Sequence, residues 1–133
     1  MSLQFYLYRA PEGTGPITSW QKMEAERLGN AAEVKKHLSQ LFPLIQWQPH
    51  NKGVVGLSSQ TTPYLDVMIT EDEVDSVFFV VFNKPPPSVM RKVMKQMNLN
   101  HACVPEADTL IDPYGYDDEA RYYKKKNNPL PTF

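Results

Sequence analysis

His101 and Cys103 come closer than any other pair in this sequence to a catalytic arrangement of residue types. An imidazole near a thiol can lower the pKa of the thiol and activate it as a nucleophile. The two residues lie in a β-favouring segment, where side chains two positions apart point the same way but stand roughly 6 to 7 Å apart. That separation exceeds hydrogen-bond reach, so we expect Cys103 to be a buried structural residue.

The other titratable residues could work as an acid and base only if the fold brought them together. His37 and His101 are the candidate bases, with Asp66 or Asp112 as the acidic partner. General acid–base catalysis requires only two such groups, placed by the fold. One hypothesis is therefore a small enzyme or ligand-binding protein with a pocket between sheet and helices. Its predicted lining residues are His37, His101, Cys103 and Asp112.

The sequence lacks the spacings that are typical of metal and cofactor sites. The three histidines and one cysteine are scattered, with no CxxC, HxxxH or HExxH pattern. Residues 71–75 are acidic but lack the glycine and ligand spacing of a calcium loop, which favours a solvated turn. Neither a Walker A motif nor a G-x-G-x-x-G motif is present. We expect no catalytic residues, no metal and no cofactor.

Composition and charge predict an ordinary folded protein without a nucleic-acid partner. Hydrophobic residues make up 41% of the 133 residues, and the net charge is -1. This charge gives no basic footprint for phosphates. The single cysteine, together with the absence of a long apolar run or a signal-like N-terminus, predicts a cytoplasmic protein that does not contact membranes. Residues 1–113 are expected to form one domain, followed by a Tyr- and Lys-rich tail over 114–133, packed or flexible.

The order of predicted elements indicates an α+β fold. Residues 3–9 alternate in polarity as a strand does, with Phe5 and Leu7 on the core side. A short helix carrying Trp20 is expected over 18–28. The next helix, over 30–42, has a capping-box pattern at Asn30 and Glu33. The remaining predicted elements are strands at 44–48, 53–58, 64–70 and 77–82, a helix after the prolines at 85–87, and a last strand over 102–111 interrupted at Pro105.

These elements predict an antiparallel β-meander of about five to six strands, with two to three helices packed mainly on one face. Residues 77–82 are apolar on both faces of the predicted strand. Such a strand needs a cover on each side. The helices supply one cover, and the sequence leaves two alternatives for the other, the C-terminal tail or a second copy of the protein. A structural homodimer is therefore one hypothesis.

The face opposite the predicted core carries several tyrosines. Tyr6, Tyr8 and Tyr64 lie on that face with Asp66. Tyrosine is enriched at protein interfaces, so these four residues are the predicted partner-binding surface. Trp20 and Trp47 are instead expected to be core anchors, because both accompany apolar helix or strand positions.

Taken in order, the segments up to Pro113 resemble small bacterial immunity-type proteins of polymorphic toxin systems. The resemblance rests on the Phe5-Tyr6-Leu7-Tyr8 opening with its Pro/Gly loop, Trp20 in a short helix, Leu41-Phe42-Pro43 before Trp47, a meander, a proline-started helix and the ending Thr109-Leu110-Ile111-Asp112-Pro113. It implies a protein that binds and blocks a cognate toxin or effector without catalysis. Inhibitors of nucleases have strongly acidic surfaces, and the near-neutral charge here argues against a nuclease partner.

Overall fold

The computed structural model describes residues 4–50, 53–58, 65–71, 75–83 and 85–115, which contain one antiparallel sheet and two α-helices. The seven strands follow the order β2-β3-β4-β5-β1-β6-β7. They are β1 (Gln4–Tyr8), β2 (Gln46–His50), β3 (Gly53–Ser58), β4 (Leu65–Thr70), β5 (Val80–Asn83), β6 (His101–Val104) and β7 (Thr109–Ile111). The predicted α+β class is confirmed, with slightly more strands than expected.

Strands β2 to β5 pair in sequence order, as a meander does, but β1 interrupts the order. It lies between β5 and β6, so that Leu7 pairs with both Val80 and Ala102. Strands β6 and β7 form a hairpin where the sequence predicted one interrupted strand. A short 3-10 turn, η2 (Pro105–Ala107), followed by Asp108 at a φ of 53°, reverses the chain between them.

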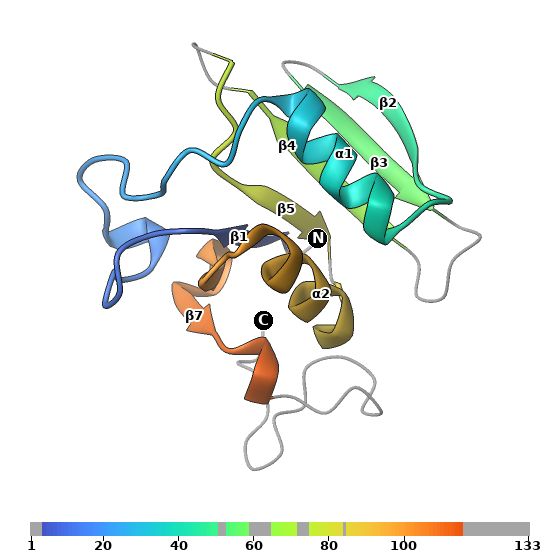
Figure 1. Ribbon diagram of the computed structural model, residues 1–133. Coiled ribbons are helices and arrows are strands. Elements are labelled where there is room, and N and C mark those ends of the chain that lie inside the picture. Colours follow the sequence, from blue (N-terminus) through green and yellow to red (C-terminus); the bar gives the residue numbers. More distant parts are fainter. Residues whose placement is uncertain (1–3, 51–52, 59–64, 72–74, 84, 116–133) are drawn as a thin grey trace.

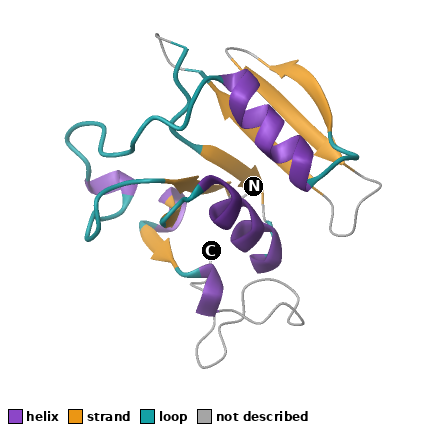
Figure 2. Ribbon diagram, in the orientation of Figure 1, coloured by secondary structure: helices purple, strands orange, loops and turns teal. Residues whose placement is uncertain are grey.

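Two helices cover the same face of the sheet, which we call the first face (Figures 1 and 2). They are α1 (Ala31–Leu41) and α2 (Pro87–Met97). The predicted capping box begins α1, because the Asn30 side chain accepts from the Glu33 N–H at 2.9 Å and the Glu33 carboxylate accepts from the Asn30 N–H at 3.1 Å. None of the helices in the described ranges has the length and apolar character needed to cross a bilayer.

The main hydrophobic core lies between the first face and the helices. Phe5 and Leu7 of β1 are completely buried there, beneath residues such as Leu38 of α1 and Met90 of α2. Figure 1 shows α1 on the side of β3 and β4, and α2 on the side of β1. Because both helices belong to one buried cluster, this core ties the two halves of the sheet together.

The opposite face, here the second face, is covered at one end by a segment that we call the strap (residues 10–25). The strap contains one short 3-10 helix, η1 (Ile17–Ser19), and otherwise has irregular structure. The prediction of a helix over 18–28 is therefore wrong. A long-range hydrogen bond from the Glu26 N–H to the Arg9 carbonyl, at 2.7 Å, takes the place of a local helical bond. The strap is the blue loop on the left of Figure 1.

The apolar run at 77–82 does not form one continuous strand. Val77 leaves the sheet and exchanges backbone hydrogen bonds with Leu28 and Gly29, at 2.8 Å each, and β5 begins only at Val80. Phe79 packs instead into a second, smaller cluster with Trp20 of the strap. The sequence predicted that the apolar run at 77–82 needs a cover on each face of the sheet. For Phe79, the strap supplies the cover on the second face.

Gly56 of β3 makes room for two large side chains on the first face. A Cβ atom at this position would lie 2.7 Å from Ile45 Cδ1 and 2.8 Å from a ring carbon of Trp47. Trp47 is itself fixed, because its indole N–H donates to the Ser39 hydroxyl at 3.0 Å. The absence of a side chain at Gly56 therefore allows Ile45 and Trp47 to pack against the sheet.

We expect Gly56→Ala to lower the free energy of unfolding by about 1–3 kcal/mol, since the new methyl group overpacks this contact. Urea denaturation with an unchanged m-value measures the loss. Gln48→Ala, at the exposed position next to Trp47 but on the opposite face of the sheet, is the control and should stay within about 0.5 kcal/mol of the parent. A Gly56→Ala protein as stable as the parent would contradict this packing.

Candidate functional site

One row of side chains crosses the second face from β3 to β6. Tyr6 pairs with Val81 on one side and with Cys103 on the other, Val81 pairs with Met68, and Met68 pairs with Val55. Residues directly opposite in neighbouring antiparallel strands have Cβ atoms about 4.5–5.5 Å apart, so these five form a continuous stripe. We call it the second-face row, and its two ends have different environments.

The strap closes the β1–β6 end of this face. Tyr8 and Cys103 both have no exposed surface and form the second cluster with Ala10 and Ala25. Trp20 meets the Tyr8 ring edge-on, with the ring centroids 5.3 Å apart. Aromatic pairs of this geometry add about 0.5–1.5 kcal/mol beyond area burial, so the Trp20–Tyr8 contact stabilises the packing of the strap on the sheet.

Polar contacts fix the strap at several points. The Asn100 side chain accepts from the Ala10 N–H at 3.0 Å and donates to the Ala10 carbonyl at 2.8 Å. Further along, the Thr18 hydroxyl donates to the Asp108 carboxylate. Just before the strap, the Arg9 guanidinium donates to two carbonyls at the end of α2, at 2.9 and 3.0 Å. The strap is therefore anchored along its length.

The other end of the row lacks such a cover among the described residues. Val55 and Met68 are half-buried and pack into neither hydrophobic cluster, and Val81 is 7% exposed. Asp66 and Asn83 lie beside them on the same face, where the Asn83 amide donates to the Asp66 carboxylate at 3.3 Å. This part of the second face, the open patch, has apolar residues at its centre and polar residues at its rim.

The structure places the predicted partner-binding residues in different environments. Tyr6 is half-buried at the boundary between the strap and the open patch, and its ring meets Phe79 edge-on at 5.5 Å. Asp66 is half-buried at the patch rim. The prediction that Tyr8 is part of an exposed binding surface is wrong, because Tyr8 lies on the predicted face but is buried beneath the strap. Tyr64 lies outside the described residues.

The predicted pocket residues are not brought together between sheet and helices. His37 belongs to α1, whereas His101 and Cys103 point from β6 to the second face, away from both helices. Asp112 is exposed after β7, where its carboxylate accepts from the Tyr114 N–H at 3.0 Å. The alternation of side chains along β6 is the physical reason, since it directs His101 and Cys103 to the face opposite the helices.

His101 has a defined tautomer. The Asn100 side-chain oxygen already accepts from a backbone N–H, which fixes the orientation of that amide. The same oxygen lies 2.7 Å from His101 Nδ1, so Nδ1 must be the protonated nitrogen that donates to it. The imidazole also stacks on the Tyr8 ring, with centroids 5.3 Å apart. Burial lowers the pKa of His101, although a backbone hydrogen bond with Thr14 acts in the opposite direction.

Cys103 has the environment of a structural thiol. Burial raises its pKa, a backbone hydrogen bond with Ile17 opposes the rise, and the charge of Asp108 adds to it. A thiol held in its protonated form is a poor nucleophile. Within the described ranges, no group of three or more His, Cys, Asp or Glu side chains is placed to hold a metal ion.

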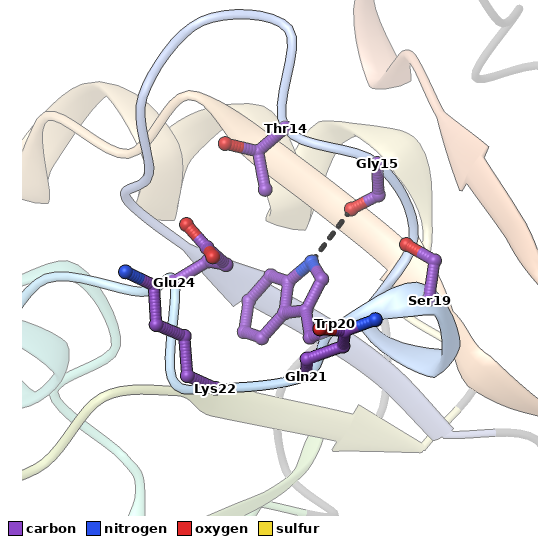
Figure 3. A pocket seen from close by; sticks show the side chains of 7 residues that line it. All are labelled: Thr14, Gly15, Ser19, Trp20, Gln21, Lys22 and Glu24. Atoms are coloured by element: carbon purple, nitrogen blue, oxygen red, sulfur yellow. Dashed lines mark hydrogen bonds between the residues drawn. The ribbon is translucent and has the colours of Figure 1, made fainter.

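Sequence reasoning missed a surface concavity of about 590 Å³ formed by the strap itself. Figure 3 shows the Trp20 indole in the middle of this concavity, surrounded by polar side chains. Its lining residues are Thr14, Gly15, Ser19, Trp20, Gln21, Lys22 and Glu24. The available signal for this concavity was a tryptophan followed closely by the polar residues Gln21, Lys22 and Glu24. The prediction of a helix over 18–28, which does not form, concealed that signal.

Comparisons with known proteins identify no relative of this chain: no protein-family model, curated protein or solved structure matches it.

We expect Tyr8→Phe to raise the free energy of unfolding by about 1 kcal/mol. The Tyr8 hydroxyl is buried without a hydrogen-bond partner in the part of the chain that the structure describes, and a buried unsatisfied polar group is destabilising. Urea denaturation gives the change, and Tyr6→Phe, at a half-buried position on the same strand and face, is the matched control with little expected effect. A clear loss of stability in Tyr8→Phe would show that the hydroxyl has a partner.

The lowered pKa of His101 predicts a loss of stability on the acidic side. The unfolded chain takes up this proton below a pH of about 6.5, whereas the folded protein takes it up only at lower pH, so stability falls as the pH falls below that value. His101→Gln, which does not titrate, should show a smaller decrease in the free energy of unfolding between pH 7 and pH 5. Identical decreases in the two proteins would contradict the assignment.

Proposed function

We propose that this chain is a protein-binding module whose open patch contacts a partner protein. The observation that carries the proposal is the end of the second-face row where Val55 and Met68 are half-buried and, among the described residues, belong to neither hydrophobic cluster. Apolar residues left without an internal cover favour an interaction surface. Tyr6 extends the same row to the edge of the strap.

The make-up of the open patch supports this proposal. Interfaces between proteins have an apolar centre, a polar rim and an enrichment in aromatic residues and methionine. Met68 is central, with Tyr6 at one side, while Asp66 and Asn83 supply the rim. The methionine side chain adapts to irregular partner surfaces because it is unbranched and polarizable.

The partner we propose is a bacterial toxin or effector protein that the chain binds and blocks. The resemblance of the ordered segments to immunity-type proteins is the support for this class of partner. An inhibitor of this kind acts by covering the partner's functional surface and requires no catalytic groups of its own. Its net charge of -1 favours a partner without a strongly basic site.

A matched pair of methionine substitutions tests the proposal. Met68→Glu places a charge in the open patch, whereas Met23→Glu makes the same change at a position that is 49% exposed on the strap. The protein encoded by the neighbouring gene is the first candidate partner to be purified and titrated by calorimetry, and the proposal expects it to be a toxin or effector. We expect Met68→Glu to weaken binding about tenfold or more, which corresponds to about 1.4 kcal/mol, and Met23→Glu to leave it unchanged.

Met68→Gln is a milder second variant that keeps the side-chain length, and thermal melts check that each variant remains folded. Equal affinity of the parent and both Met68 variants would remove the open patch from the interface. A doubled mass in solution that Met68→Glu reduces to that of a monomer would identify a second copy as the occupant, and would overturn the toxin assignment in favour of a structural homodimer.

A further inference from the structure

The concavity on the strap is a second surface that protein binding through the open patch does not use. Its floor is the Trp20 indole, and its walls all come from residues 14–24. Volumes of about 300–1,000 Å³ are typical of small-molecule sites, and the 590 Å³ here lies within that range. The Trp20 ring is half-buried, so part of it is available to a ligand.

The indole is held in place before any ligand arrives. Its N–H donates to the Gly15 carbonyl at 2.9 Å, the bond drawn in Figure 3. The ring also stacks on Phe79, with an interplanar angle of 28°, and meets Tyr8 edge-on. A side chain fixed by three contacts loses little conformational entropy when a ligand binds, which favours affinity.

The wall of the concavity offers both hydrogen-bond donors and acceptors. The Ser19 and Thr14 hydroxyls each donate to a backbone carbonyl at 2.6 Å, which leaves their lone pairs as acceptors. Gln21 can donate and accept, and the opposite charges of Lys22 and Glu24 cancel. These groups match a neutral ligand that carries many hydroxyls around an apolar face.

We propose that the Trp20 concavity binds a saccharide, with one C–H face of a sugar ring on the indole and its hydroxyls on the polar wall. Each sugar hydroxyl can donate and accept, as the mixed wall requires. The electron-rich face of an indole attracts the weakly positive C–H groups of a sugar ring. This inference is independent of the proposed protein-binding function.

Other ligand classes fit the concavity less well. A nucleobase is usually held between two aromatic or apolar walls, and this concavity has one aromatic ring. A phosphate would meet a single lysine beside a carboxylate, and no other cationic side chain lines the site. An organic cation would be attracted by Trp20 and Glu24 but repelled by Lys22.

Nuclear magnetic resonance of the whole ¹⁵N-labelled protein tests the proposal through its two tryptophans. The probes are glucose, N-acetylglucosamine, cellobiose and chitobiose, each titrated to about 20 mM, which would fill a site with a Kd of about 1 mM to roughly 95%. We expect at least one of them to shift the Trp20 indole N–H signal with saturation. The Trp47 signal is the internal control, because that indole N–H donates to Ser39 at a distant position and should not move.

Variants of the wall and floor make the test specific. Gln21→Ala and Trp20→Phe should each weaken saccharide binding about fivefold or more, and Met23→Ala, exposed on the same segment but outside the lining, should not. Because Trp20→Phe removes the indole signal, its affinity is measured from the backbone amide signals of residues 14–24. No saturable Trp20 shift with any saccharide, or equal shifts of both tryptophans, would overturn the proposal. A shift with adenosine or choline alone would overturn the ligand class. Met68→Glu leaves this result unchanged, so the two proposals fail separately.

Discussion

The insertion of β1 between β5 and β6 is the constraint on which the rest of the structure depends. This central strand is covered on both faces, whereas an antiparallel sheet commonly leaves one face to solvent. Phe5 and Leu7 face the two helices, and Tyr8 faces the strap. The main core and the second cluster are therefore joined through one five-residue strand, and the strap follows that strand almost directly in the sequence.

The strap divides the second face into two parts with different properties. Over β1 and β6 it buries Tyr8 and Cys103, which removes the phenol and the thiol from solvent and raises both of their pKa values. Over β3 and β4 the same face carries Val55 and Met68 outside either cluster. The closed part adds a second, smaller cluster to the main core, and the open part is the basis of the proposed partner binding. The concavity around Trp20 arises on the outer side of the same strap.

Local patterns in the sequence predicted the elements whose formation depends on interactions between residues close in the sequence. The helix capped by Asn30 and strand β3 occur where expected, because capping and strand patterns act within a few residues. The strap was not predictable in this way. Its helix-like spacing is overridden by contacts of Trp20 with Tyr8 and Phe79, which come from distant parts of the chain. Strand alternation predicts that His101 and Cys103 point to the same face of the sheet. The segment that covers that face could not be predicted, because it depends on the position of β1 in the sheet.

The central claim is that the strap closes one end of the second face, whereas no described residue covers the other end, and thiol labelling tests it most directly. Cys103 is the single cysteine of the chain, and Met68→Cys in a Cys103→Ala background moves the thiol along the same row to the open patch. Under native conditions the account predicts slow labelling of Cys103 by a maleimide, limited by opening of the strap, and rapid labelling at position 68. Rapid labelling of Cys103, or protection of a thiol at position 68, would contradict it.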